Sequence, residues 1–386
     1  MPSGREAGAR RPLAGRGRPA PAAAVSRLLV LSASMGSGHD AVAGELGRRL
    51  HDAGHQAVQL DVLDMLPARI GPLLRAFYRS TVRHTPFVYA AIYAVFFRNG
   101  SGPRPGSSPL AVLAEDRLRQ EVTRTRADAV VAVFHLAAQL TGRMRATGGL
   151  RVPSAVVVTD FVAHRQWLHP GNDLNLCLTP AIAREMRQTL RRPAVACGPL
   201  LPHRFRPHPP GEERWRRSLA TADGRPAVLL SAGAWGVGSR LAETAHLLSA
   251  AGYLPVVLCG QDRRLAARLA REPGVRALGW VDDMPGLIAA CAALIDNAAG
   301  QTALEALAVG TPVVGYRPIP GHGAEGVRSM AAHGLSHYAA DPWQLLQRLD
   351  QLTIRRPAAD GAPGGNRLVP GDVVGPLAGL VSAQGH

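Results

Sequence analysis

The sequence predicts an α/β protein with two doubly wound domains, and three observations carry that prediction. Short β-branched runs alternate with amphipathic stretches from Arg27 onward, which is typical of parallel sheets covered by helices on both faces. A proline-rich stretch near the middle interrupts the alternation, and a second series of the same kind follows. The 386 residues suit about two domains of ~100 to 200 residues each. We therefore expect two Rossmann-like domains facing each other across a central cleft.

The elements of each series follow from these runs. The first domain is expected over residues 27–200, with strands at 28–32, 57–60, 129–133 and 155–158 and a helix at 41–53. The second is expected over residues 225–352, with strands at 227–230, 254–258, 293–295 and 312–314 and helices at 241–251, 263–270, 302–309 and 342–352. Residues 201–224 are expected to form the interdomain linker, residues 1–26 a disordered Arg-, Pro- and Ala-rich tail, and residues 353–386 a Pro- and Gly-rich C-terminal tail.

Composition and charge exclude several classes of protein and point to anionic ligands. With 46% apolar and 19% charged residues, the chain is neither disordered throughout, nor collagen-like, nor a disulfide-stapled miniprotein. All 44 basic residues are arginines, so lysine chemistry is excluded. The net charge of +16 attracts phosphates on nucleotides, anionic lipids or nucleic acid. The sequence holds no nucleic-acid-binding motif, so no nucleic-acid partner is expected.

Cysteine spacing and hydropathy bear on the compartment. The four cysteines are far apart and form no C-x-x-C, which favours buried thiols in a reducing, cytoplasmic compartment. The N-terminal tail holds no continuous apolar segment of the kind found in secretory signals, and the chain has no uncharged apolar run of about 18 residues. We therefore expect a cytoplasmic protein without a membrane-spanning helix.

A glycine-rich turn joins the first expected strand to the first expected helix. Gly36, Gly38 and Ala41 satisfy G-x-G-x-x-A, and such a turn points backbone N–H groups and the positive helix end toward a polar or anionic ligand. A dinucleotide-binding oxidoreductase is one interpretation, although His39 would then occupy the turn that holds the pyrophosphate. At the mouth of the cleft His39 could instead be a general base, or a polar residue that caps the helix.

The second series carries a glycine loop at 231–238 and a longer motif at 296–325. Small residues up to Gly300 allow close approach of a ligand, and Thr302 is expected to cap a helix whose N-terminus neutralises a diphosphate without a metal. Glu305 could accept hydrogen bonds from both hydroxyls of a ribose, or it could serve only the helix dipole. Two glycine loops, one per domain, direct both sheet edges toward one cleft.

Several motifs taken together resemble a known family. They are SASMGSGH at 32–39, VVTDFVAHRQWLHP at 157–170, CGPLLPHRF at 197–205, AGAWGVG at 232–238, GWVDDMPGLIAACAALID at 279–296 and GQTALEALAVGTPVVGYRPIPG at 300–321. In this order they resemble GT-B glycosyltransferases of the group that includes monogalactosyldiacylglycerol synthases, processive diacylglycerol glucosyltransferases and, more distantly, MurG. The resemblance spans roughly residues 27–338.

The resemblance implies an inverting transfer of galactose or glucose from a UDP-sugar to a diacylglycerol-like hydroxyl, with no metal or other cofactor. It places His39, Asp160 and His164 at the catalytic, acceptor-facing side. On the donor side it implies a set that faces the diphosphate, base, ribose and sugar: Gly233, Gly236, Gly238, Val281, Met284, Gly300, Thr302, Glu305 and His322. The acidic pairs Asp61/Asp64 and Asp282/Asp283 are interpreted as a strand end and a loop, so no metal site is expected.

Two regions bear on specificity. Relatives usually carry PGQE where this chain has PGHGAEG at 320–326, which leaves open a changed donor or a catalytically weakened nucleotide-sugar-binding homologue. Seven of the 18 aromatic residues lie within residues 70–98 among arginines. Such a segment suits an anionic membrane surface, here the inner face of the plasma membrane, or else packs as a helical subdomain. The residues assigned to acceptor and membrane are Gly36, Gly38, Phe87, Tyr93, Phe96 and Phe97. A non-lipid acceptor remains an alternative.

Overall fold

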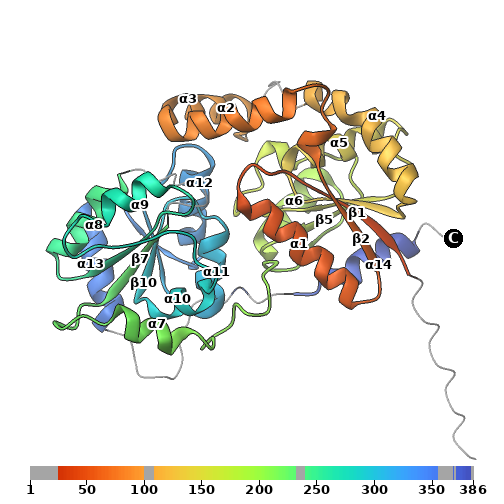
Figure 1. Cartoon of the computed structure of the whole chain (residues 1–386). Helices are drawn as coiled ribbons and strands as arrows, with labels where there is room; N and C mark the ends of the chain where they lie inside the picture. The colour runs from red at the N-terminus through yellow and green to blue at the C-terminus, as the bar shows by residue number, and fades with distance from the viewer. Residues whose placement is uncertain (1–24, 100–107, 232–239, 355–367, 369–370, 384–386) are drawn as a thin grey trace, which may run out of the picture.

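The computed structural model describes residues 25–99, 108–231, 240–354, 368 and 371–383. Two parallel six-stranded sheets, each covered by helices, form two lobes (Figure 1). Most of the tail predicted at residues 1–26 lies outside the described residues. In the part of the chain that the structure covers, no helix is both long enough and apolar enough to cross a bilayer.

The N-terminal sheet has the order β2-β1-β3-β4-β5-β6. In β1, the second strand in this order, residues Leu28 to Leu31 are at most 3% exposed, as expected for a strand with helices on both faces. The strands are β1 (Arg27–Ser32), β2 (Gln56–Asp61), β3 (Ala129–Ala132), β4 (Ser154–Val157), β5 (Leu174–Cys177) and β6 (Ala194–Ala196). The helices are α1 (Ser37–Asp52), α2 (Ile70–His84), α3 (Pro86–Phe96), α4 (Ser108–Thr125), α5 (His135–Ala146) and α6 (Pro180–Leu190).

The C-terminal sheet has the order β12-β11-β10-β7-β8-β9, again with parallel pairs. Its strands are β7 (Ala227–Ser231), β8 (Leu254–Leu258), β9 (Arg276–Leu278), β10 (Ala293–Asp296), β11 (Val313–Tyr316) and β12 (His337–Ala339). Its helices are α8 (Leu241–Ala250), α9 (Arg263–Leu269), α10 (Met284–Ala290), α11 (Gln301–Val309), α12 (His322–Ala332) and α13 (Pro342–Ile354). In both sheets the carboxyl ends of the strands lead into the loops that carried the sequence motifs.

Two segments predicted as irregular contain helices. Within the expected linker, α7 (Glu212–Leu219) packs on α10, and Trp215 Nε1 donates to Asp283 Oδ2 at 3.1 Å. Within the expected C-terminal tail, α14 (Val374–Ser382) returns to the N-terminal domain, where Val373 and Leu377 are buried beside Leu200. These helices were not predicted because they are short and lie in segments rich in proline and glycine. Burial of their apolar side chains in the tertiary structure stabilises them.

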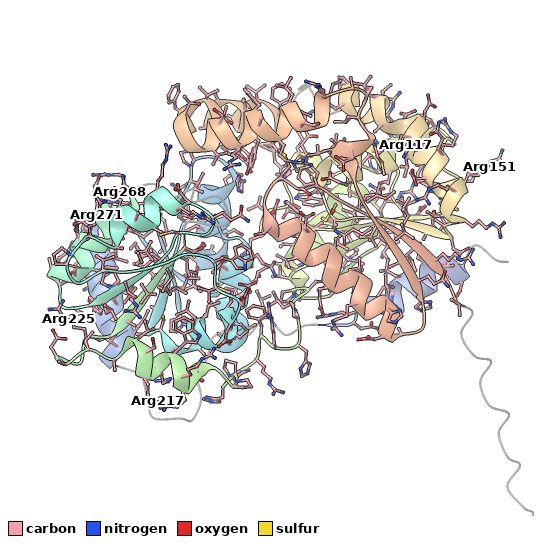
Figure 2. The ribbon with its side chains drawn as sticks, in the orientation of Figure 1. Arg117, Arg151, Arg217, Arg225, Arg268 and Arg271 are labelled. Carbon is pink, nitrogen blue, oxygen red and sulfur yellow. The ribbon has the colours of Figure 1, made fainter. Side chains whose placement is uncertain are left out.

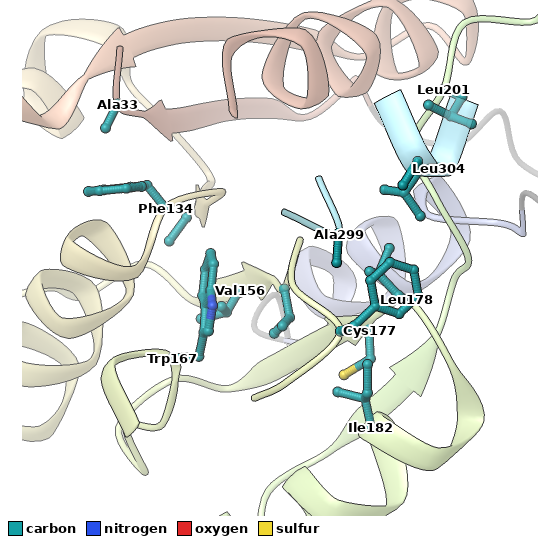
Figure 3. Close-up of a cluster of buried hydrophobic side chains, with 14 of the residues drawn as sticks. Ala33, Phe134, Val156, Trp167, Cys177, Leu178, Ile182, Leu201, Ala299 and Leu304 are labelled. Carbon is teal, nitrogen blue, oxygen red and sulfur yellow. The ribbon is translucent and has the colours of Figure 1, made fainter. Parts of the chain in front are cut away.

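Apolar packing also joins the two domains. The buried cluster in Figure 3 includes Trp167 and Leu178 of the first domain and Ala299 and Leu304 of the second. In Figure 1, α2 and α3 extend from the first lobe across the top toward α12 of the second. The labelled arginines in Figure 2 lie on the outer surface of both lobes, so positive charge is spread over the molecule. The two domains therefore meet at the buried apolar cluster and also near α2, α3 and α12.

Candidate functional site

A pocket of about 520 Å³ lies at the carboxyl edge of the N-terminal sheet. Its walls come from the glycine loop before α1, the helices α2, α3 and α4, the start of α5 and the loop after β4. One further lining residue, His322, comes from α12 of the second domain. The pocket is thus built mainly by one domain and completed by the other.

The pocket is apolar along its helices and polar at its base. Leu74, Ile92 and Leu110 line it from α2, α3 and α4 respectively. The polar lining includes Asp160 and four imidazoles, those of His39, His135, His164 and His322. Few polar groups within an apolar cavity are typical of a site that orients a mostly hydrophobic ligand.

His39 lies in the first turn of α1, directly after the glycine loop. Its Nδ1 is 3.0 Å from the carbonyl oxygen of Val133, and its ring meets the Phe134 ring edge-on at 5.0 Å. Because a carbonyl only accepts, Nδ1 carries the proton and Nε2 keeps a lone pair. Burial lowers the pKa of His39 below its usual value, although Asp160 and the Val133 hydrogen bond oppose that shift. A neutral imidazole with a free lone pair is suited to accept a proton.

The helix-capping alternative for His39 does not fit this geometry. Gly36 is the N-cap of α1, and no side chain of the described residues caps that helix. Gly36 has a φ of 137°, a backbone conformation that residues other than glycine rarely adopt. Gly36 therefore forms the turn, and the imidazole of His39 lines the pocket.

Asp160 and His164 are hydrogen-bonded to each other in the loop after β4. His164 Nε2 is 3.2 Å from Asp160 Oδ2, and Trp167 Nε1 donates to the same oxygen at 2.8 Å. His164 Nδ1 accepts from the Gln166 amide at 3.3 Å, so its Nε2 is the donor to the carboxylate. Burial alone would raise the pKa of Asp160, but the hydrogen bonds from His164 and Trp167 stabilise the carboxylate and hold the pKa well below its usual range. Asp160 is therefore an ionised carboxylate.

His135, which was not predicted from the sequence, lies beside His164 in the lining of the pocket. Its ring centroid is 5.6 Å from that of His164 and 5.0 Å from that of Phe97. Burial lowers the pKa of His135 well below its usual value, and its buried Nδ1 has no hydrogen-bond partner among the described residues. One signal was present: like His39, His135 follows a buried strand at the carboxyl edge of the sheet.

His322 was predicted on the donor side, but the structure places it in the pocket of the first domain. Tyr89 Oη lies 2.6 Å from His322 Nδ1, and burial lowers the pKa of this imidazole. Nearby, Tyr93 donates to Glu325 Oε2 at 2.8 Å, and Arg98 Nε is 3.3 Å from Glu325 Oε1. The PGHGAEG loop and α12 therefore hold the two domains together through α3.

The aromatic segment divides into inward and outward faces. Phe87 is 71% exposed, whereas Tyr93 is buried and Phe96 and Phe97 line the pocket. The helices α2 and α3 thus form a helical subdomain that has exposed apolar side chains on its outer surface. Phe87 alone of the four predicted acceptor or membrane aromatics remains mainly exposed to solvent.

On the donor side, Glu305 lies one turn into α11. Burial raises its pKa to about 7, while the charge of Arg204 and a hydrogen bond from Gln301 oppose that shift. Thr302 was expected to cap α11, but Gly300 is the N-cap and has extended backbone, so Thr302 lies inside the helix. A Cβ on Gly38 would lie 3.7 Å from Gln301 Cβ, so the first turns of α1 and α11 lie next to each other.

The other predicted donor residues lie around this point or outside the described chain. Gly233, Gly236 and Gly238 lie outside the described residues. Val281 and Met284 are partly buried at the start of α10, where Asp283 Oδ1 accepts from the amide of Gly286 at 3.2 Å. Asp61 likewise accepts from the Leu63 amide, so both carboxylates serve local turns. Within the described ranges, no group of three or more potential ligands is arranged to hold a metal ion.

Comparison with known families matches residues 39–196 to the model of monogalactosyldiacylglycerol (MGDG) synthase. Among curated proteins, the processive diacylglycerol beta-glucosyltransferase of Bacillus subtilis (strain 168) is 24% identical over 348 residues, covering 84% of this chain and 86% of that protein. The enzyme of the same name from Bacillus pumilus is 23% identical over 320 residues, covering 80% and 82%. These matches confirm the resemblance predicted from the motifs.

Solved structures with the same architecture include MurG of Acinetobacter baumannii, at 16% identity and a TM-score of 0.53, covering 85% of this chain and 90% of that one. The calicheamicin glycosyltransferase CalG4 matches at 16% identity and a TM-score of 0.53, covering 87% and 91%. Anabaena HepE, solved in complex with UDP-glucose, matches at 14% identity and a TM-score of 0.50, covering 85% and 89%. The two facing domains thus have the GT-B fold, as the sequence predicted.

Proposed function

We propose that this GT-B chain transfers a hexose from a UDP-sugar to the hydroxyl of a diacylglycerol-like lipid at a membrane surface. The relatives named above are diacylglycerol glycosyltransferases, and that resemblance supports a glycosyltransferase acting on a lipid. The observation that carries the proposal is the position of His39. Its Nε2 lone pair meets an apolar pocket at the cleft between the domains, where a lipid hydroxyl and a sugar donor would meet.

In this mechanism His39 accepts the proton of the acceptor hydroxyl as its oxygen attacks the anomeric carbon. The ionised Asp160 stabilises the imidazolium that forms, because its charge raises the pKa of His39. His164 and Trp167 position the carboxylate through the hydrogen bonds described above. A single in-line displacement of this kind inverts the anomeric configuration and releases UDP.

The donor half is supported by α11 and its surroundings. The N-terminus of α11 lies next to the first turn of α1 in the other domain and would provide a positive end for the departing diphosphate, with no metal required. Glu305, one turn along, is placed to accept hydrogen bonds from the ribose hydroxyls once it is ionised. HepE, which has the same fold, binds UDP-glucose, and this supports a UDP-sugar as donor.

The outer surface of α2 and α3 supports contact with a membrane. Leu73, Phe77, Phe87 and Val95 are each at least 48% exposed, and apolar side chains above a cationic surface favour the interface of an anionic bilayer. This face borders the pocket, since Phe77 is also one of the lining residues. A lipid acceptor could therefore reach the pocket directly from the membrane.

The proposal is tested by incubating the protein with labelled UDP-glucose or UDP-galactose and vesicles that contain diacylglycerol and anionic phospholipid. We expect label in the lipid fraction, in equal amount with and without chelator. If UDP binds but no label reaches lipid from either donor, the chain is instead a nucleotide-sugar-binding homologue. Transfer to a water-soluble aglycone but never to lipid would contradict the lipid acceptor, and loss with chelator followed by rescue with magnesium would contradict metal independence.

A further inference from the structure

We propose that the pocket receives one hydrocarbon chain of the acceptor, and that any second chain stays outside, along the exposed face of α2 and α3. This rests on the proposed function and deepens it, because it defines the acceptor as a hydroxyl joined to a single buried chain. A glycerolipid with only one acyl chain would then fill the site as well as a diacylglycerol does.

The pocket has the volume of a site for one chain. At about 520 Å³ it lies within the range of about 300 to 1,000 Å³ for pockets that enclose a drug-sized ligand. Glycerol, one ester group and about ten carbons of one chain make a ligand of that size, whereas a diacylglycerol with two 16-carbon chains is much larger.

The distribution of side chains gives the orientation of that chain. The hydroxyl end must lie at His39 and Asp160, because these groups exchange and stabilise the proton. From there the apolar wall of Leu74, Ile92 and Leu110 continues between α2, α3 and α4. A hydrocarbon chain pointing away from the histidines would be dehydrated along its length, and each buried methylene would strengthen binding.

One side of the pocket is closed and another is open. The contacts of Tyr89 with His322 and of Tyr93 with Glu325 close it against the second domain. Phe77 lines the pocket and is still 50% exposed, so it marks the opening. Leu73 and Phe87 extend the apolar surface beyond this opening and would contact a second chain left in the bilayer.

The test measures binding rather than transfer. Radiolabelled 1-monoacylglycerols with 6 to 14 carbons, each below its critical micelle concentration, are brought to equilibrium dialysis with the wild-type protein. We expect affinity to rise roughly threefold to fourfold per added methylene and then to level off at about ten to twelve carbons. A steady rise up to 14 carbons, or no dependence on length, would overturn the proposal.

Leu110 and Leu113 of α4 provide a matched pair of variants. Leu110 lines the pocket, whereas Leu113 is 46% exposed on the same helix. Leu110→Trp should move the plateau to shorter chains and Leu110→Ala to longer ones, while Leu113→Trp should leave it unchanged. A plateau that moves in neither Leu110 variant, or equally in the Leu113 variant, contradicts a chain at this position. Because the two Leu110 variants shift the plateau in opposite directions, general destabilisation cannot produce the expected pattern.

The second chain is tested by comparing 1-monooctanoylglycerol with 1,2-dioctanoylglycerol in the same dialysis experiment without vesicles. We expect affinities within about threefold of each other. A gain from the second chain as large as that from the first would place both chains inside and overturn the proposal. These measurements need no sugar donor. If the protein binds monoacylglycerols as expected but transfers no hexose, the proposed activity is refuted and the occupant of the pocket is still established.

Discussion

The two halves of the cleft are built in different ways. In the N-terminal half, polar side chains fix one another: His39 bonds to a backbone carbonyl, and Asp160 bonds to His164 and Trp167. In the C-terminal half, the candidate site is a helix N-terminus with one partly buried carboxyl group, Glu305, whose pKa is raised to about 7. The difference fits the two proposed roles, because proton transfer needs side chains held by tertiary packing, whereas nucleotide binding can rest on backbone geometry and a single acid.

The largest effect expected from this comparison comes from His39→Ala. Removing a general base typically costs about 10² to 10⁴ in rate, so kcat for transfer should fall by that factor. Affinity for UDP should stay within about twofold of wild type, because the imidazole belongs to the acceptor half. His51→Ala, an exposed histidine on the same helix, is the control and should retain wild-type rates. Equal losses in both variants would contradict the assigned role.

A smaller effect, about tenfold to a hundredfold in kcat/KM, is expected for Asp160→Asn, which keeps the shape of the side chain but removes its charge. The charge of Asp160 raises the pKa of His39 against the effect of burial. Without it, His39 becomes protonated only at lower pH and is a weaker base. The acid limb of the kcat/KM profile should therefore move to lower pH. A limb that moves upward, or stays in place, would show that the carboxylate does not act on His39.

Substitutions in the donor half should change the affinity for UDP. Glu305→Gln should weaken UDP binding by about tenfold, since hydrogen bonds to a charged acceptor are lost. In the wild type, UDP affinity should rise as pH increases through about 7, where Glu305 loses its proton. Arg204 holds that pKa down, so Arg204→Ala should move the transition to higher pH. The measurement is calorimetric titration with UDP, and the control is Glu213→Gln, which replaces an exposed glutamate on α7. If the pH dependence of UDP affinity persists in Glu305→Gln, the carboxyl group of Glu305 is not its source.

The smallest effect concerns the membrane surface. Complete burial of a phenylalanine is worth about 1.5 to 3 kcal/mol, and partial insertion of Phe87 into an interface is worth less, so Phe87→Ser should reduce binding to anionic vesicles by up to about tenfold. Transfer to a water-soluble short-chain acceptor should be unaffected. Trp343→Ser, equally exposed on α13 of the other domain, should bind vesicles as the wild type does. Equal partitioning of both variants would count against this face.

Much of the fold could be predicted from sequence because parallel strands buried on both faces give continuous apolar runs. The strand expected at 254–258 matches β8, and most others differ by one or two residues. The missed strands, β5, β6, β9 and β12, are three or four residues long and give little periodic signal. The helices α7 and α14 were hidden by proline and glycine, and they depend on contacts with distant elements.

The candidate site was predictable where it follows directly from a motif. Asp160 and His164 are four residues apart within one short loop, so their pairing is local. The contact of His322 with Tyr89 joins residues 233 positions apart, and nothing in the sequence specifies it. The ring contacts of His135 are also long-range, because they come from Phe97, directly after α3, and from His164 in the loop after β4. Long-range packing, rather than residue type, sets these positions.

The central claim is that acceptor and donor bind to separate halves of one cleft. The most direct test measures two dissociation constants, for UDP and for a water-soluble monoacylglycerol, in Glu305→Gln and in Leu110→Trp. We predict that Glu305→Gln weakens UDP about tenfold and leaves the monoacylglycerol within about twofold of wild type, and that Leu110→Trp does the reverse for chains of ten or more carbons. If either variant weakens both ligands equally, or the wild-type protein binds neither, the account is contradicted.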